Sequence, residues 1–458
     1  MRILLINPKS DEGKFGRLYH SLPFYVNAIF PPLGLAYIGA VLEKSDNEVT
    51  ILDANALDLE IDKIVSYAKD FKPDIIGITC QITTLKTCLS VAKIIKKEVK
   101  SIKIILGGPV FIFKTIVKET LRNSFIDFIV IGEGEETVVK LVDALKNSND
   151  LSEVDGIGYK KKNKIVFTAS RKLIENLNSI PFPAYHLLPT NKYKLNNNKV
   201  CCISTSRGCV FDCKFCGQNY MWGRKVRLRN AKNIVDEIEH LYKNFSVRWF
   251  KFTDDLFTFN SSHIKNVCKE IIKRKLKIKW TCQTRVDFVD EEMLKLMKKV
   301  GCISICYGVE SGSEKTLQYI RKNISLNLIK NTFRLTRKNG IYPQASFIIG
   351  FPHEDEKEIE KTVEFAKKLR AINYGLNILF PIPNTPIYKE IERKRLFSKP
   401  FIRTTFLSSR ELIKIANRKH TNLLIAGLLN LFVNSLARII ENPLETFEVL
   451  KEFGRMFL

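Results

Sequence analysis

The chain has 458 residues, of which 45% are hydrophobic and 27% charged, so it is long enough for two or three folded domains and is not a disordered protein. Its formal net charge is +26 at pH 7, which fits nucleic-acid binding, attraction to an anionic membrane surface or acidic substrate, or a compositional bias toward Lys, Asn and Ile. No nucleic-acid-binding module accompanies the charge, and the lysines are scattered over predicted helix faces. We therefore favour the compositional explanation and expect no nucleic-acid partner.

The N-terminus and the cysteines indicate the compartment. The first apolar run, Arg2–Asn7, is too short for a secretory signal and is not followed by a cleavage site. Eleven cysteines in such a chain favour metal or redox chemistry in a reducing cytoplasm over a disulfide scaffold. Oxygen would damage such a site, so we expect an anaerobic or microaerobic host.

Residues 1–147 alternate apolar runs with helical stretches and form the first predicted domain. The runs are apolar throughout rather than alternating, which is typical of strands buried on both faces of a parallel sheet. Five such units predict an α/β fold with a doubly wound, Rossmann-like sheet. The predicted strands are Arg2–Asn7, 49–53, 74–80, 103–108 and 127–132, and helices are expected at Leu33–Glu43, 59–69 and 83–97.

Polar residues and glycines follow the carboxyl ends of these strands, where open α/β sheets bind their ligands. Glycine lets the backbone approach a ligand closely, and helix N-termini at this edge offer free N–H groups. The alternative is that these glycines serve only the turns. The candidate cofactor-binding residues are Asn7, Thr79, Gln81, Gly107, Gly108, Gly132, Glu133 and Gly134.

Three further regions follow. Residues 148–199 are proline-rich in part and predict a linker with a small hairpin. Residues 200–390 return to the βα alternation, with strands expected at 200–204, 249–253, 278–283, 302–309, 344–349 and 376–381, and predict a partial TIM-type barrel of six βα units. Residues 391–458 are predicted to be helical. The Leu-rich stretch 421–440 is interrupted by Asn and Arg, so we expect a helix that packs on the barrel, caps a substrate or lies on a membrane surface, and not a membrane span.

The strongest chemical motif is a CxxxCxxC loop, formed by Cys209, Cys213 and Cys216 just after the first predicted barrel strand. A zinc site would require a fourth Cys or His at matched spacing, and none is evident. A [4Fe–4S] cluster takes four ligands, so three cysteines leave one iron open to a ligand that is not part of the protein. The loop therefore predicts a [4Fe–4S] cluster held by these three residues.

This loop resembles the signature of the radical S-adenosylmethionine (radical SAM) superfamily. The resemblance implies that S-adenosylmethionine chelates the open iron and is cleaved to a 5′-deoxyadenosyl radical, with Phe215 beside the adenine. It also implies cofactor-binding roles at successive strand ends. Thr253, Asp254 and Asp255 would hold the methionine amino group. Gln283 and Arg285 end the third barrel strand as further cofactor-binding candidates, and Arg285 would pair with the methionine carboxylate. The alternatives are helix capping by the two aspartates and a structural ion pair for Arg285.

The later strand ends extend the resemblance. Residues 308–312 look like the family's GVESG segment, which implies that Glu310 or Ser311 lies near the ribose. Gly350 begins a Gly-Phe-Pro turn whose backbone would face the adenine. Residues 381–386 resemble the segment P-x-P-G-T-P, with Asn384 in place of the usual glycine.

The N-terminal half resembles the cobalamin-binding domain that precedes the barrel in class B radical SAM enzymes, through residues 31–37, 52–55, 107–109 and 132–135. The family includes B12-dependent radical methyltransferases and anaerobic magnesium-protoporphyrin monomethyl ester cyclases. One departure concerns the D-x-H-x-x-G motif of many cobalamin proteins, because no histidine lies between His20 and His186. Cobalamin would then bind without a histidine ligand to cobalt.

The resemblance implies an enzyme that uses the radical to methylate, cyclise or oxidise an unactivated carbon of a small molecule. The apolar C-terminal stretch suggests a lipid-like or isoprenoid-like substrate and contact with a membrane surface. An external electron donor such as flavodoxin or ferredoxin is implied. The alternatives are a tRNA methylthiotransferase-like enzyme and a radical SAM enzyme whose N-terminal domain binds no cobalamin. The first lacks the three additional N-terminal cysteines that such enzymes require, since only Cys80 and Cys88 lie in that half.

Overall fold

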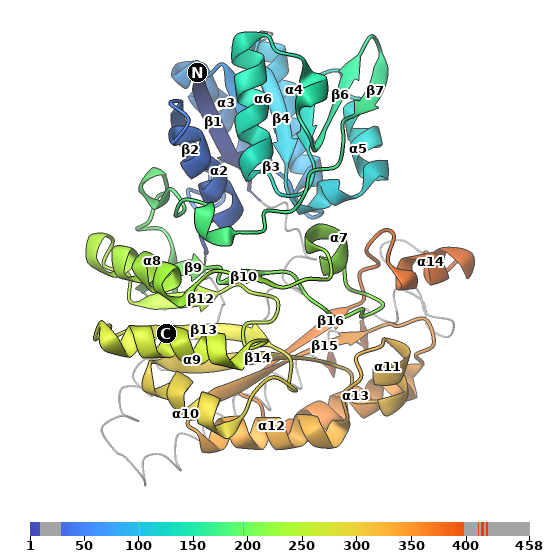
Figure 1. Ribbon diagram of the computed structural model, residues 1–458. Helices are drawn as coiled ribbons and strands as arrows, with labels where there is room; N and C mark the ends of the chain where they lie inside the picture. Colours follow the sequence, from blue (N-terminus) through green and yellow to red (C-terminus); the bar gives the residue numbers. More distant parts are fainter. Residues whose placement is uncertain are drawn as a thin grey trace. The chain divides into compact units, whose positions relative to one another are not determined.

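The structure is a computed structural model that describes residues 1–9, 29–99, 101–195 and 197–397, together with residues 411, 414, 415, 418 and 419. The chain divides into two compact units (Figure 1). The first contains the N-terminal strand, Ile29–Tyr193 and Tyr220–Arg229, and the second contains Lys194–Asn219 and the chain from Asn230 onward. The predicted helix within 421–440 lies outside the described residues, and so do the substrate-capping and membrane-surface roles suggested for it.

The first unit is built on a seven-stranded sheet with the strand order β2-β1-β3-β4-β5-β6-β7. Its first five strands run parallel, and the strand order reverses between β1 and β3. Ligands of doubly wound sheets bind at this reversal, beyond the carboxyl ends of the strands. The five strands are β1 (Arg2–Asn7), β2 (Glu48–Asp53), β3 (Ile75–Thr79), β4 (Lys103–Gly107) and β5 (Phe128–Val130).

Helices cover both faces of this sheet, as predicted (Figure 1). On one face α2 (Leu33–Glu43) contacts α6 (Glu135–Asn147). On the other face Leu4 and Ile6 of β1 belong to one buried core with side chains of three further helices. These are α3 (Ile61–Phe71), α4 (Leu85–Glu98) and α5 (Lys114–Leu121).

The hairpin predicted between the domains is formed by β6 (Ile157–Lys161) and β7 (Lys164–Phe167). It does not stand free, because β6 pairs antiparallel with β5 and extends the first sheet. The short strand β11 (Arg227–Leu228), far along the chain, also belongs to the first unit.

The second unit contains a seven-stranded sheet with the order β16-β15-β14-β13-β12-β9-β8. Six of its strands are parallel neighbours in chain order, as in a half-barrel, and β8 pairs antiparallel with β9 at one edge. The parallel strands are β9 (Asn198–Ile203), β12 (Trp249–Phe252), β13 (Lys279–Thr284), β14 (Cys302–Glu310), β15 (Tyr342–Ile349) and β16 (Asn373–Ile378), and β8 spans Lys194–Leu195.

Helices follow the strands of this sheet and cover one of its faces (Figure 1). The long helices are α8 (Ala231–Asn244), α9 (Ser261–Lys273), α10 (Glu291–Lys299), α12 (Leu326–Lys338) and α13 (Glu356–Leu369). Each begins after an Asn, Asp or Ser whose side chain accepts a hydrogen bond from the first turn, which satisfies a backbone N–H that the helix leaves free. The shorter helices are α7 (Gln218–Trp222), α11 (Glu314–Tyr319) and α14 (Pro386–Arg393), and β10 spans Ser206–Arg207.

The two faces of the second sheet differ in polarity. Phe250, Trp280 and Phe347 point to one face and are fully buried. Side chains alternate between the two faces along each strand, and on the other face Lys251, Gln283 and Ser346 retain exposure to solvent. In the described part of the chain, no helix is long and apolar enough to cross a membrane.

Candidate active site

The three predicted cluster ligands lie on one loop between β10 and α7 in the second unit. Cys209, Cys213 and Cys216 are half-buried, whereas seven of the other eight cysteines are fully buried, the exception being Cys306 on β14. The loop thiols are therefore among the few that a solvent-borne metal species can reach. Among the described residues, no three Cys, His, Asp or Glu side chains lie close enough together to hold a metal ion as they stand.

The electrostatic surroundings of the three thiols differ. Burial raises the pKa of each of them, and it raises that of Cys216 to about 12. The cations of Lys322 and Arg285 act in the opposite direction on Cys213, and Lys322 does so on Cys209. At Cys216 a hydrogen bond with the Gln218 backbone acts against burial, whereas the neighbouring thiols and Asp255 raise the pKa further. Metal binding requires thiolates, so three thiols with two cations beside them fit a cluster-binding donor set.

Asp254 and Asp255 follow β12 but have different surroundings. The carboxylate of Asp254 is buried and accepts hydrogen bonds from Thr205 N, Thr205 Oγ1 and Ser206 Oγ. It therefore braces the turn that leads into the cysteine loop. Asp255 is half-buried, and burial, followed by the charge of Asp254, raises its pKa to about 7. Thr253, just before them, bonds through N and Oγ1 to the carbonyl oxygen of Ile203 on β9.

Arg285, which follows β13, forms the structural ion pair that was the alternative to methionine-carboxylate binding. Its Nε and Nη2 donate to the carboxylate of Asp287 at 2.9 and 2.8 Å, and its guanidinium stacks 3.8 Å from the ring centroid of Phe211. Phe211 lies in the cysteine loop, so this stacking contact links Arg285 to the loop. Its Nη1 is buried and has no partner. Gln283 on the same strand keeps its side chain exposed.

Glu310 ends β14 and is paired with a residue that the sequence motifs did not identify. Lys322 Nζ donates to Glu310 Oε1 at 2.9 Å, and the two side chains are only 6% and 10% exposed. The Glu310 carboxylate, which was predicted to lie near the ribose, is therefore paired with Lys322 in this structure. Ser311 is fully buried, and its hydroxyl lies 3.1 Å from Thr362 Oγ1 of α13, so it is also a structural residue.

The ends of β15 and β16 contact the cysteine loop as well. The ring of Phe215 packs against the ring of Phe351 at a centroid distance of 6.1 Å. Glu354 Oε2 accepts hydrogen bonds from the backbone N–H groups of Gly350 and Phe351, at 2.7 and 3.0 Å. The Gly350 N–H therefore has a protein partner.

Ile382 follows β16 and packs close to Gly217, the residue directly after the third cysteine. A Cβ added at Gly217 would lie 3.0 Å from Ile382 Cγ2. Asn384 has a φ of +67°, which is a left-handed backbone conformation. Glycine, the residue expected here from the P-x-P-G-T-P segment, adopts this conformation readily, and Asn tolerates it. The replacement of glycine by Asn384 therefore preserves the turn.

The carboxyl edge of the first sheet holds the predicted cobalamin-binding residues. Asn7 Nδ2 donates to Asp53 Oδ1 at 2.8 Å, and Tyr193 Oη donates to Asp53 Oδ2 at 2.7 Å. Asn7 and the buried Asp53 thus tie the ends of β1 and β2 together, and the amide of Asn7 is occupied. The side chain of Gln81 is exposed, and Thr79 is half-buried at the end of β3.

The glycines at this edge of the sheet fall into two groups, two in tight packing and two in open surroundings. A Cβ at Gly108, whose φ is +113°, would lie 2.4 Å from Cys80 O, and a Cβ at Gly134 would lie 3.0 Å from Ile38 Cδ1. Both allow close packing. Gly132 has a φ of +83° with no atom within 4 Å of its absent Cβ, and Gly107 is nearly as open. These two leave backbone exposed at the ligand edge, as a large cofactor would need.

Glu133 is buried and bonded within the first unit. Its carboxylate accepts from Arg227 Nη1 at 3.0 and 2.9 Å and from the backbone N–H of Ile174 at 2.7 Å. The Arg227 and Glu133 side chains are 2% and 0% exposed. Glu133 is therefore a structural anchor for Tyr220–Arg229 within the first unit.

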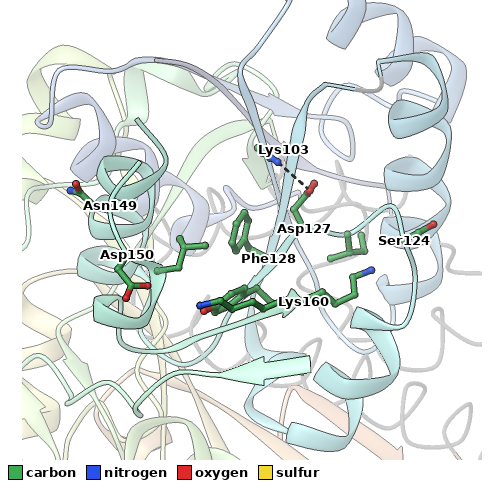
Figure 2. Close-up of a pocket in the computed structure, with 11 residues that line it drawn as sticks. Lys103, Ser124, Asp127, Phe128, Asn149, Asp150 and Lys160 are labelled. Carbon is green, nitrogen blue, oxygen red and sulfur yellow. Dashed lines mark ion pairs between the residues drawn. The ribbon is translucent and has the colours of Figure 1, made fainter. Parts of the chain in front are cut away.

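A separate cavity of about 390 Å³ lies at the opposite edge of the first sheet (Figure 2). Lys103 and Phe128, the first residues of β4 and β5, line it together with Lys160, and Asp127 pairs there with Lys103 at 3.8 Å. It is remote from the strand ends that carry the predicted cofactor-binding residues, because it lies where β4 and β5 begin.

Two family models match the chain: the B12 binding domain over residues 24–142 and the radical SAM superfamily over residues 203–366. An uncharacterized methyltransferase of Pyrococcus horikoshii is 34% identical over 390 residues, which cover 85% of this chain and 83% of the relative. The anaerobic magnesium-protoporphyrin IX monomethyl ester cyclase of Rubrivivax gelatinosus is 31% identical over 405 residues, covering 86% and 70%.

Two solved structures share the fold. The cobalamin-dependent S-adenosylmethionine radical enzyme OxsB matches with a TM-score of 0.75 at 19% identity, covering 99% of this chain and 75% of that one. The radical S-adenosylmethionine methyltransferase TsrM of Kitasatospora setae matches with a TM-score of 0.74 at 18% identity, covering 92% and 88%.

The chain belongs to the radical SAM enzymes that carry an N-terminal B12-binding domain. The predicted family and the α/β fold, a doubly wound sheet followed by a half-barrel, are confirmed. The protein is an enzyme whose cofactors are a [4Fe–4S] cluster, S-adenosylmethionine and cobalamin.

Proposed function

We propose that the protein is a methyltransferase that acts on an unactivated carbon of a small molecule, with Cys209, Cys213 and Cys216 as the ligands of its [4Fe–4S] cluster. The observation that carries this proposal is the convergence of groups from successive βα units on one cysteine loop. Asp255, Arg285, Phe351 and Ile382 follow the ends of β12, β13, β15 and β16, and Lys322 follows helix α11 after β14. Each lies in the electrostatic or packing environment of the loop. The names of the Pyrococcus and Kitasatospora proteins support methyl transfer.

Within this proposal the chain's own residues have distinct tasks. Asp255 receives the amino group of S-adenosylmethionine, because its half-buried carboxylate beside Cys209 and Cys216 has no partner and a cation would offset its burial. Asp254, Arg285 and Glu354 position the loop and its neighbouring turns through the hydrogen bonds described above. When bound, the cluster and S-adenosylmethionine supply the radical and cobalamin carries the methyl group.

For cobalamin, the carboxyl ends of β3, β4 and β5 offer Thr79, Gln81, Gly107 and Gly132 as contacts. Asn7 and Glu133 bond to Asp53 and Arg227, and Gly108 and Gly134 allow close packing, so within this proposal their effect on the cofactor is indirect. No histidine between His20 and His186 is available to ligate cobalt, and His186 is exposed and lies 3.0 Å from a Glu43 carboxylate oxygen.

We further propose that the substrate carries hydrogen-bonding groups. The exposed face of the second sheet presents Lys251, Gln283 and Asn377, which suit a polar molecule better than a lipid. The lipid-like substrate and the membrane contact suggested by the C-terminal stretch depend on residues outside the described part of the chain. An external one-electron donor such as flavodoxin or ferredoxin completes the proposal.

The test is anaerobic reconstitution with iron, sulfide and hydroxocobalamin, followed by metal analysis and an assay for 5′-deoxyadenosine. We expect about four irons and one cobalt per chain. Cys213→Ala should lose the cluster spectrum and 5′-deoxyadenosine formation. The matched control is Cys306→Ala, a half-buried cysteine outside the loop, which should keep both. Iron loading without cobalt would contradict the methyl-transfer proposal and leave the cluster assignment standing.

Oxidative cyclisation is the second candidate, because the 31% identical Rubrivivax relative is named a cyclase. The two are separated by supplying S-adenosylmethionine with a deuterated methyl group to the enzyme and a host cell extract. Transfer of the labelled methyl group to a small molecule supports methylation. Turnover of S-adenosylmethionine with no labelled product supports cyclisation.

A further inference from the structure

The stretch of the cysteine loop around Cys213 reaches the surface of the second unit. The residues on either side of this cysteine, Asp212 and Lys214, keep 43% and 21% of their side chains exposed. Arg321, which follows α11, is also exposed, and its Nη1 donates to Asp212 Oδ2 at 3.0 Å. A protein that docks here would contact the residues adjacent to a proposed cluster ligand.

Helix α14 begins at this same stretch of the loop. Ile387 N, in the first turn of the helix, donates to Lys214 O at 3.2 Å. One turn later, a Glu390 carboxylate oxygen lies 4.0 Å from Lys214 Nζ and accepts from Tyr319 Oη of α11 at 2.6 Å. Lys214 Nζ also lies 3.9 Å from the centroid of the Tyr319 ring. The loop, α11 and α14 therefore share one continuous surface. We call it the loop-side surface and define it by Asp212, Lys214, Arg321 and residues 386–397.

The α14 part of the loop-side surface is basic. Lys389 and Arg393 are exposed and lie four residues apart, so they are neighbours on one side of the helix. Lys394 is exposed just beyond the helix end and pairs with Glu390 at 2.8 Å. Between residues 386 and 395 four Lys and Arg residues outnumber two Glu residues. The surface beside the cysteine loop thus carries a net positive charge and suits an acidic partner.

An exposed aromatic ring lies next to these cations. Phe397 is 47% exposed, and its ring packs against that of Tyr388 at a centroid distance of 5.2 Å. Aromatic residues and Arg are enriched in protein interfaces, where a few of them carry most of the binding energy. Complexes that transfer electrons use small interfaces, for which one aromatic contact among charges is enough.

We propose that the loop-side surface docks an acidic electron-carrier protein, which reduces the cluster. The inference rests on the proposed function, in which the cysteines of this loop hold that cluster. One electron passes from the reduced carrier to the oxidised cluster, so the carrier is oxidised by one electron and the cluster is reduced by one. No bond is formed or broken at the docking surface. Opposite charges on the two proteins speed their encounter and orient the carrier over the loop.

The experiment measures 5′-deoxyadenosine formation by the reconstituted holoenzyme as the concentration of a reduced flavodoxin, an acidic carrier, is varied. The double variant Lys389→Glu/Arg393→Glu should raise the half-saturating flavodoxin concentration about tenfold at low ionic strength, and added salt should reduce the difference. With reduced methyl viologen, a small cation, as the electron source, the same variant should keep its rate. The matched control is Lys269→Glu/Lys273→Glu, two exposed residues with the same spacing on α9, whose last turn leads to the amino end of β13. It should keep both rates.

An unchanged flavodoxin dependence in the α14 variant, or an equal change in the α9 control, overturns the inference. If the α14 variant loses its rate with methyl viologen as well, its fold is damaged, and Lys389→Gln/Arg393→Gln then decides. This milder variant should need more flavodoxin while its methyl viologen rate holds, and the absence of that shift overturns the inference. An unsubstituted holoenzyme that forms no 5′-deoxyadenosine with either reductant would instead overturn the proposed function.

Discussion

Arg227 and Glu133 form an ion pair that is buried within the first unit although 94 residues separate them in sequence. Arg227 Nη1 also donates to Ile174 O at 2.6 Å, whereas its Nε and Nη2 have no partner. One guanidinium nitrogen therefore joins three chain segments: the turn after β5, the segment before β8 and the stretch that follows the cysteine loop.

Breaking this pair should destabilise the first unit. Arg227→Met leaves the Glu133 carboxylate buried without its cation, and we expect a loss of about 3–5 kcal/mol in the free energy of unfolding. Lys225→Met is the matched control, because the Lys225–Glu175 pair is exposed and should contribute nothing measurable. Urea unfolding followed by circular dichroism measures both. An equal effect of the two substitutions would contradict the structural role of Arg227.

Glu354 should make the stability of the second unit depend on pH. Burial raises the pKa of its carboxyl to about 8, well above the value in an unfolded chain. Between about pH 4.5 and pH 8 the folded state keeps a proton that the unfolded state has released, so stability should fall as pH rises, by roughly 5 kcal/mol at most. Glu354→Gln resembles the protonated form and should flatten this dependence in thermal unfolding scans. A dependence of the opposite slope would show that the carboxylate is ionised in the fold.

The two glycines of the GVESG segment should differ in their tolerance of a methyl group. At Gly312 a Cβ would lie 2.5 Å from Phe365 Cβ and 2.7 Å from Thr362 Cα, so helix α13 would have to move, and Gly312→Ala should cost about 3 kcal/mol. Gly308→Ala meets only the ends of Glu310 and Lys322 and should cost less. Gly34→Ala, with no neighbour within 4 Å, is the control and should be neutral or stabilising. Chemical denaturation gives the order, and a reversed order for the first two would refute the packing argument.

Asp255 should be required for S-adenosylmethionine and not for the fold. Asp255→Asn removes a half-buried carboxylate to which the described residues give no partner, so the cofactor-free protein should be as stable as the unsubstituted one or more so. Binding of S-adenosylmethionine to the cluster-loaded enzyme, measured by equilibrium dialysis, should weaken at least tenfold. In contrast, Asp254→Asn should lower stability, because Asp254 accepts from Thr205 and Ser206. Unchanged binding by Asp255→Asn would remove it from the site.

The fold could be predicted from sequence because each strand is an apolar run that stops at a recognisable turn. The predicted run 103–108 is β4 to within one residue, and the helix at Leu33–Glu43 has the expected bounds. The same logic located the cysteine loop and the strand-end motifs. Such patterns report where a chain turns, and they carry no information about which side chains then meet.

For that reason the contact partners of the site residues could not be predicted from the sequence. Lys322 is one of 74 Lys and Arg residues, and only the fold brings it to Glu310. Glu133 was predicted at the ligand edge because it follows a strand, and the sequence does not show that its carboxylate pairs with Arg227. Asp254 and Asp255 are adjacent and chemically alike, and their roles separate because one meets Thr205 while the other faces the cysteine loop.

The membership of Tyr220–Arg229 in the first unit has a consequence for biosynthesis. Domains generally fold as units while the chain is being made, starting from the N-terminus. Here the ribosome must complete residue 229 before the first unit can bury Glu133 against its partner. The cysteine loop is synthesised before that moment, so the nascent B12-binding unit stays unfinished until the proposed cluster ligands have left the ribosome. A fragment ending at residue 199 would lack Arg227, so it could not form the buried pair with Glu133.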